Sequence, residues 1–308
     1  MNTTIENRLI WLNGNIVNLP DARINVLAPT SQFGANVFEG IRCYWNEEQK
    51  QLFAFRLDEH YKRLQESIKL FRLETDYTIK DFKNALLDVV RSNDYREDIA
   101  VRQTVFLDGF GSWNSKKEVG MFVAPIPKKR LEYNEDTGLI CGISSWIRIS
   151  DRNMSPKAKV GANYINSRMA QLEAMEHGYQ SAIFLNDNGK VAEGPGSCLF
   201  MIKNGELVTP PLSASILDSI TRKTIIELVK KDTDIPVIER DIERTELYLA
   251  DEVFLCGSAM EIMPVKEIDG YIIGSGKYGE LTYKLHDMYM KVVTGQNVEY
   301  KKWLTSIY

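Results

Sequence analysis

Lys159 is the residue whose surroundings in this 308-residue chain best suit covalent chemistry. It lies in residues 154–167 (MSPKAKVGANYINS), and three small or medium side chains (VGA) follow it before a predicted helix begins. Space above those side chains would let a large group pack against the ammonium, and burial lowers the pKa of a lysine amine until it becomes a nucleophile. A solvated loop lysine is the ordinary alternative, and Lys157 fits that description better than Lys159.

The residues after the lysine have the apolar spacing of a helix. Four of them recur every three or four positions: Ile165, Met169, Leu172 and Met175. We predict Asn163 as the N-cap and Gly178 as the C-terminal stop. Lys159 should therefore lie just before a helix and not on its solvated face.

Charge and composition narrow the range of partners. The chain is 44% hydrophobic, and it has 38 basic against 42 acidic side chains with no polybasic run or acidic tail. We therefore expect no nucleic-acid partner, and no apolar run approaches the roughly 20 residues that cross a bilayer. Residues 1–8 (MNTTIENR) lack the features of a secretion signal, so we expect a cytoplasmic protein.

Cysteine and histidine are too dispersed for several common kinds of site. The four cysteines include no close pair of the zinc or thioredoxin type, and the three histidines form no metal-type pair: Cys43, Cys141, Cys198, Cys256, His60, His177 and His286. We expect reduced thiols, no bound metal and no Ser-His-Asp site. Polar chemistry with this inventory would gain from an organic cofactor.

The order of predicted elements suggests two domains. The first half has a hairpin around Asn13-Gly14, amphipathic helices over 57–71 and 79–91, and a strand over 99–106. Residues 126–137 are rich in proline and charge, so we predict domains 1–125 and 138–308 joined by this linker. The second half should contain a strand near 139–144, a β-meander over 181–209, helices over 221–231 and 280–293, and strands around 237–240 and 253–256.

Several polar residues stand where such elements could aim them into a cleft. Arg102 alternates with buried-type neighbours, so it faces either a cleft or water, and Glu193 should stand at a strand end. The predicted helix near Thr221 offers free backbone amides to a phosphate, although an ordinary N-cap by Asp218 or Ser219 explains the same residues. We expect Asp218 to point away, because its carboxylate would repel an anion.

Several motifs together resemble those of the branched-chain aminotransferases, the fold type IV pyridoxal-phosphate enzymes. They are residues 37–42 (VFEGIR), 159–164 (KVGANY), 192–200 (AEGPGSCLF), 220–222 (ITR) and 250–254 with 257–258 (ADEVF, GS). They follow the family's order along nearly the whole chain. The resemblance implies an α+β fold with a small N-terminal α/β domain and a larger β-rich C-terminal domain.

The resemblance also implies a role for individual residues. Lys159 would bind pyridoxal phosphate covalently and move the substrate's α-proton, which requires an amine pKa below the ordinary value. Glu193 would keep the ring nitrogen protonated, and Tyr164 would lie near the ring hydroxyl. The remaining implied contacts to the cofactor are Arg63, Leu217, Ile220, Thr221, Gly257 and Ser258. The implied substrate contacts are Phe33, Phe38, Gly40, Arg102, Ser258 and Ala259.

The substrate side departs from the family pattern more than the cofactor side. Phe33 and Ala100 stand where the family has tyrosines, Ile126-Pro127 replaces a tryptophan, Cys198 replaces an asparagine, and Ser258 replaces a threonine. The resemblance implies transfer between branched-chain L-amino acids and 2-oxoglutarate by a homodimer or larger homo-oligomer. The alternatives are a transaminase for bulky or aromatic amino acids, a D-amino-acid transaminase, an aminodeoxychorismate lyase or a silent binding protein.

Overall fold

The computed structural model describes residues 7–134 and 136–308. Residues 1–6, which carry most of the N-terminal segment used above, and residue 135 of the predicted linker lie outside the described residues. No helix in the described ranges is long and apolar enough to cross a membrane.

The chain divides into two compact units of nearly equal length. Unit 1 comprises residues 1–130, 158–162 and 291–308, and unit 2 comprises residues 131–157 and 163–290. The sequence prediction differed, because it assigned all of 138–308 to one larger domain. Residues 158–162 and the C-terminal segment instead belong to the first unit, and the predicted linker is divided because a strand runs to Pro127.

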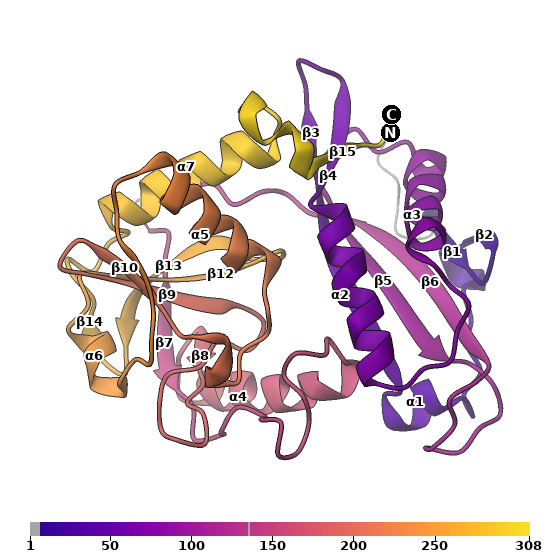
Figure 1. Cartoon of the computed structure of the whole chain (residues 1–308), viewed down its shortest axis with the longest axis horizontal. Coiled ribbons are helices and arrows are strands. Elements are labelled where there is room, and N and C mark those ends of the chain that lie inside the picture. Colours follow the sequence, from indigo (N-terminus) through magenta and orange to yellow (C-terminus); the bar gives the residue numbers. More distant parts are fainter. Residues whose placement is uncertain (1–6, 135) are drawn as a thin grey trace. The chain divides into compact units, whose positions relative to one another are not determined.

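Unit 1 is built on a seven-stranded sheet in the order β15-β4-β3-β5-β6-β1-β2, with all neighbours antiparallel. Figure 1 shows α2 and α3 beside this sheet. The helices and strands are β1 Leu9–Leu12, β2 Asn15–Asn18, α1 Pro29–Phe33, β3 Asn36–Asn46, β4 Gln51–Phe55, α2 Leu57–Leu70, α3 Ile79–Asn93, β5 Ile99–Leu107, β6 Val119–Pro127 and β15 Leu304–Ser306. The predicted hairpin at Asn13-Gly14 and both predicted helices are confirmed.

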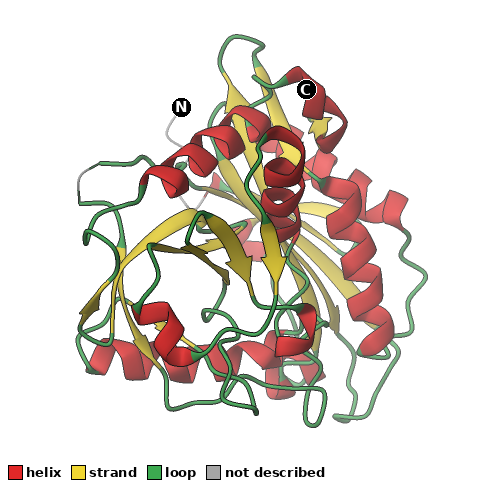
Figure 2. Cartoon of the chain, turned by 60° about the vertical axis from the view of Figure 1, so that its left-hand side comes forward, coloured by secondary structure: helices red, strands yellow, loops and turns green. Residues whose placement is uncertain are grey.

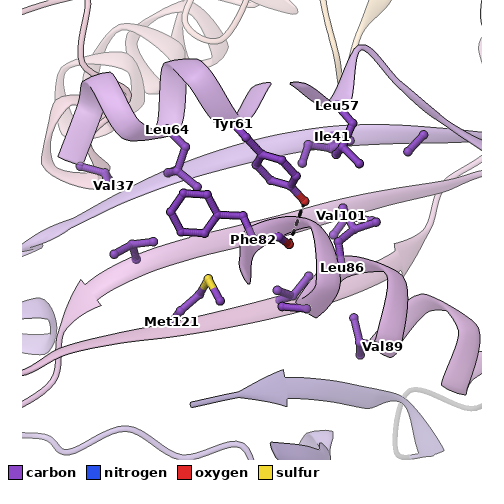
Figure 3. Close-up of a cluster of buried hydrophobic side chains, with 14 of the residues drawn as sticks. Val37, Ile41, Leu57, Tyr61, Leu64, Phe82, Leu86, Val89, Val101 and Met121 are labelled. Carbon is purple, nitrogen blue, oxygen red and sulfur yellow. Dashed lines mark hydrogen bonds between the residues drawn. The ribbon is translucent and has the colours of Figure 1, made fainter. Parts of the chain in front are cut away.

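The core of unit 1 follows from two simple periodicities. Every second residue of β3 and β5, including Ile41 and Val101, faces the helices, which contribute Leu64 and Phe82 at helical spacing. Figure 3 shows these side chains packed together. The hydroxyl of Tyr61 donates to Phe82 O at 3.1 Å, so this buried polar group is satisfied. The alternate residues of β3 and β5 point to the opposite face of the sheet.

Unit 2 is built on a mixed sheet in the order β11-β10-β9-β12-β13-β7-β8, with β14 paired to β13. Its strands are drawn in yellow in Figure 2. The elements are β7 Leu139–Ile143, α4 Tyr164–Glu176, β8 Ser181–Ile183, β9 Cys198–Lys203, β10 Glu206–Thr209, α5 Ile220–Asp232, β11 Val237–Glu239, α6 Arg244–Tyr248, β12 Glu252–Gly257, β13 Glu261–Ile268, β14 Tyr271–Ile272 and α7 Glu280–Val293, of which residues 291–293 belong to unit 1. The predicted hairpin at Asn204-Gly205 and the final helix are confirmed.

Two local predictions in unit 2 are confirmed only in part. Residues 184–186 and 190–193 form the predicted antiparallel turn as a local bridge, but β8 itself pairs in parallel with β7. Asn163 is the N-cap residue of α4, but its side chain makes no cap hydrogen bond and its Nδ2 donates to Ser155 O at 3.1 Å. Gly178 does follow the helix with a φ of +85°, the left-handed conformation expected at such a stop.

The apolar stripe of α4 faces outward. Ile165 and Met175 are 61% and 60% exposed, and Met169 is 37% exposed. The helix packs on β8 through small side chains, with Ala170 and Ala174 buried. The helical spacing thus predicted the element correctly, but the stripe is not its packing face.

Candidate active site

Lys159 is fixed to unit 1 by its backbone. Its N–H donates to Ser67 Oγ at 3.0 Å and its carbonyl accepts from Phe38 N at 3.0 Å, while Val160 pairs with Val37 of β3. Gly161 lets this segment approach β3 closely, because a Cβ there would lie 2.4 Å from Asn36 Oδ1 and would displace that side chain. The short segment 158–162 therefore lies against β3 with little freedom.

The side chain of Lys159 is half-buried, and its Nζ lies 4.9 Å from the centroid of the Phe38 ring. Lys157 is exposed, with its Nζ 4.0 Å from Asp151 in a solvated ion pair. These surroundings favour Lys159 over Lys157 as the reactive amine, as the sequence suggested. Its covalent role stays a prediction.

A buried charge cluster in unit 1 joins β3 to α2. Arg63 Nε and Nη2 donate to the two carboxylate oxygens of Glu39 at 2.8 and 2.6 Å, and His60 Nδ1 lies 2.7 Å from Oε2. Burial raises the pKa of Glu39, but the charge and hydrogen bonds of Arg63, together with His60, outweigh it and lower that pKa to about 2. The predicted phosphate contact, Arg63, is thus pre-oriented by a fully buried carboxylate.

His60 is neutral at physiological pH. Burial lowers its pKa, the charges of Arg63 and Lys159 act in the same direction, and Glu39 opposes them. A neutral His60 can donate Nδ1–H to Glu39 without adding a charge to the cluster. The sequence singled out neither His60 nor the role of Glu39, although Glu39 belongs to the VFEGIR motif.

The sheet face opposite the unit 1 core carries the predicted substrate residues. Antiparallel register places Gly40, Arg102 and Ala124 side by side, and Arg102 is exposed as the alternation predicted. Its guanidinium carbon lies 3.9 Å from the Phe38 ring centroid, so Phe38 contacts both Arg102 and Lys159. Phe33 is half exposed at the end of α1.

Glu193 is the central charged residue of unit 2 and is only 3% exposed. Its backbone carbonyl accepts from Phe184 N at 2.9 Å, which anchors the residue beside β8. Its Oε1 accepts from Arg148 Nε at 2.8 Å, and its Oε2 accepts from Leu217 N at 3.1 Å. The predicted Leu217 is therefore held beside the predicted acid, by its backbone amide.

Arg148 and Cys198 both contact the Glu193 carboxylate. The sequence reading missed Arg148, although an arginine between apolar residues (WIRIS) ahead of the lysine was a usable signal. Cys198 Sγ lies 3.6 Å from Glu193 Oε2. Burial, with the neighbouring Glu193 charge, holds the pKa of Cys198 well above its usual range, so the group is a thiol and a weak donor.

The predicted anion site lies at the start of α5. Ser219 caps this helix by accepting from Arg222 N at 3.3 Å, while Asp218 pairs with Lys223 at 2.5 Å. Ile220 and buried Thr221 form the first turn, where backbone amides lack helical acceptors. The start of α5 therefore has both an ordinary N-cap at Ser219 and backbone amides that could bind a phosphate.

A second turn in unit 2 brings glycines close together. Gly257 ends β12, and a Cβ there would lie 3.2 Å from Gly196 O. Ser197, next to Gly196, has a buried Oγ without a hydrogen-bond partner among the described residues. Ser258 and Ala259 continue this turn, and Tyr164 is the first residue of α4.

The structure thus groups the predicted residues within each unit. Lys159, Phe38 and Arg102 come together in unit 1, and Glu193, Leu217 and Cys198 come together in unit 2. Over the described ranges, no three His, Cys, Asp or Glu side chains are arranged to hold a metal ion.

Comparison with known proteins gives consistent matches over almost the whole length. The family model described as "Amino-transferase class IV" matches residues 36–268. A probable branched-chain-amino-acid aminotransferase of Aquifex aeolicus is 38% identical over 299 residues, covering 97% of this chain and 96% of the relative.

Solved structures agree with these sequence matches. The branched-chain aminotransferase of Thermoproteus uzoniensis with norvaline is 38% identical with a TM-score of 0.92, covering 98% of this chain and 99% of the other. The enzyme of Thermobaculum terrenum in its PLP-form is 38% identical with a TM-score of 0.91, covering 99% and 100%.

Proposed function

Since the chain belongs to the class IV amino-transferases, we propose that it is a pyridoxal-phosphate-dependent transaminase acting on branched-chain L-amino acids and 2-oxoglutarate. The observation that carries this proposal is the half-buried Lys159 amine on a fixed backbone beside Phe38. Relatives named for branched-chain amino acids support the substrate class.

The residues present fit this cofactor. A buried carboxylate at Glu193 suits a protonated ring nitrogen, and the amides of Ile220 and Thr221 suit a phosphate. The Ser197 hydroxyl, which has no hydrogen-bond partner in the described part of the chain, and the close glycine turn at Gly257 offer further contacts for an anion. Arg63, held by Glu39, would add a guanidinium to the phosphate.

Pyridoxal phosphate supplies an aldehyde that condenses with amines and a ring that accepts electrons from the α-carbon. Within this chemistry, Lys159 Nζ would take the α-proton from the substrate and later return it, acting as base and then acid. Glu193 holds the proton on the ring nitrogen. Phe38 shields the lysine from water, and Arg102 binds the side-chain carboxylate of glutamate or 2-oxoglutarate.

Borohydride reduction of the purified yellow protein tests the assignment of the amine. We expect the reduced cofactor on the peptide that contains Lys159, and cofactor on Lys157 would refute the assignment. Incubation with L-leucine and 2-oxoglutarate should yield L-glutamate. Activity with D-alanine alone, or pyruvate release from aminodeoxychorismate, would instead support one of the two alternative reactions.

A second substrate class is favoured by the open face of the unit 1 sheet. A Cβ added at Gly40 would meet no heavy atom of its unit within 4 Å. Ala100 lies two residues before Arg102 on β5, so both side chains are on the same face of the sheet. Ala124 of β6 is paired with Arg102. Small residues around Phe38 leave room for a large side chain, so we propose that aromatic amino acids are also substrates.

Ala100→Tyr tests this breadth by restoring bulk to the open face. We expect kcat/KM for phenylalanine to fall at least about tenfold relative to leucine, the cost of excluding a few methylene-sized groups. Calorimetry with two unreactive analogues should agree: the affinity for 3-phenylpropionate should fall more than the affinity for 4-methylvalerate. An unchanged ratio would remove the aromatic class.

We further propose that the enzyme is a cytoplasmic homodimer or larger homo-oligomer. The exposed stripe of α4, Ile165, Met169 and Met175, belongs to the same unit as exposed Trp146 and Ile147, and Asn166 Nδ2 of this helix donates to Ile147 O at 3.0 Å. Apolar side chains gathered on one helix suit burial against a second copy. All four cysteines are free, which suits a reducing compartment.

A further inference from the structure

The carboxylate of Glu193 is neutralised by a buried arginine. Arg148 is 7% exposed, and both its Nε and its Nη2 lie 2.8 Å from the same oxygen, Oε1. A carboxylate and a guanidinium this close and this desolvated stabilise each other's charged forms, and removing one leaves the other unpaired. Glu193 and Arg148 therefore form one buried ion pair, in which each group depends on the other.

Arg148 is itself held in place. Its Nη1 donates to Asn166 Oδ1 at 3.3 Å, and Asn166 Nδ2 donates in turn to Ile147 O at 3.0 Å. The backbone N–H of Arg148 donates to Leu185 O at 2.9 Å. The direction of the guanidinium is thus set by α4 and by the segment after β8, independently of any ligand.

The second oxygen of Glu193 has weaker partners. Oε2 accepts from Leu217 N at 3.1 Å and from the Cys198 thiol at 3.6 Å. A thiol is a poor donor compared with the amide that an asparagine would present there. The orientation of the Glu193 carboxylate therefore depends mainly on Arg148 and on the backbone amide of Leu217.

We propose that Arg148 is a positioning residue that keeps Glu193 a carboxylate with Oε2 presented to the ring nitrogen, and that Cys198 makes this enzyme unusually dependent on it. The proposal rests on the proposed function, because it assumes that Glu193 contacts the cofactor ring. A carboxylate paired with a guanidinium is a poor proton acceptor, so the proton stays on the ring nitrogen. Arg148 need not touch the cofactor or the substrate.

The test reads the protonation of the ring nitrogen directly. The holoenzyme is reconstituted with pyridoxal phosphate labelled with 15N in the ring, and the 15N chemical shift is followed from about pH 6 to pH 9. We expect a protonated nitrogen throughout in the unmodified protein and in Arg148→Lys. In Arg148→Met the nitrogen should lose its proton within this range, and turnover should fall roughly 10- to 100-fold, as when a group that orients a ligand is removed.

The matched control and the double variant separate positioning from folding. Arg152→Met removes an exposed arginine of the same segment and should change neither the 15N shift nor turnover. Cys198→Asn alone should change turnover less than about threefold, but it should restore part of the loss in Arg148→Met because its amide can donate to Oε2. If Arg148→Met does not fold, Arg148→Gln and Arg148→Gln/Cys198→Asn replace it and its double variant, because glutamine also removes the positive charge but can still donate a hydrogen bond.

The possible outcomes separate the role of Arg148 from the proposed function itself. A nitrogen that stays protonated in Arg148→Met, with turnover near normal, overturns this inference while borohydride labelling of Lys159 leaves the proposed function intact. Strictly additive losses in the double variant overturn the role of Cys198. Failure of the unmodified protein to bind the cofactor at Lys159 would remove the proposed function itself.

Discussion

Replacing Glu39 by glutamine should destabilise unit 1 by about 3 kcal/mol and change its response to acid. Glu39 is fully buried, and both of its oxygens accept from Arg63. Glutamine keeps the shape but not the charge, so the guanidinium of Arg63 would lose its buried counter-ion. His60 cannot replace this counter-ion, because an imidazole carries no negative charge.

The magnitude follows from the pKa of Glu39. A value of about 2 in the folded protein, against about 4.3 for an unperturbed glutamate, corresponds to about 3 kcal/mol of folding free energy at neutral pH. Because the unfolded chain takes up the proton at the higher pH, this stabilisation is complete above about pH 5 and is lost as the pH falls toward about 2. The glutamine variant should lack this part of the acid dependence.

Urea denaturation of the holoprotein, followed by tryptophan fluorescence at pH 7 and at about pH 4, measures both effects. We expect Glu39→Gln to lower the urea midpoint at pH 7 by about 1–2 M and to narrow the difference between the two pH values. Glu48→Gln, at an exposed position in the turn between β3 and β4, should leave the urea midpoint unchanged. A glutamine variant with the unmodified midpoint and acid response would refute the charge cluster as a source of stability.

Three further predictions concern the remaining proposals. Arg102→Leu should reduce kcat/KM for glutamate roughly 10- to 100-fold more than for leucine, the worth of one charged hydrogen bond, and equal losses would show that Arg102 does not bind the side-chain carboxylate. Glu193→Gln should retain the yellow cofactor, measured by absorbance, while turnover falls by about 100-fold or more; full activity would contradict the role of the acid. Ile165→Glu with Met169→Glu should shift the sedimentation coefficient to that of a monomer, whereas Glu176→Gln on the same helix should not; an unchanged assembly in the double variant would exclude this stripe as the interface.

The sequence determined the elements whose signals are local. The Asn13-Gly14 hairpin, the helices α2 and α7 and the alternation around Arg102 are each fixed by spacing within a dozen or so residues. It also determined the chemistry available, since a lysine before a helix and a glutamate in a glycine-rich turn are matters of residue type and order. These features depend on neighbours in the chain, which a sequence displays directly.

Only the tertiary structure decided how distant segments pair. Residues 158–162 lie against β3 in the first unit, β8 joins β7 in parallel, and the apolar stripe of α4 faces outward because small alanines pack against the sheet instead. The two buried ion pairs, Glu39 with Arg63 and Glu193 with Arg148, span 24 and 45 positions. Their partners are chosen by strand order and by which face of each element is buried, and those are properties of the whole fold that no local spacing contains.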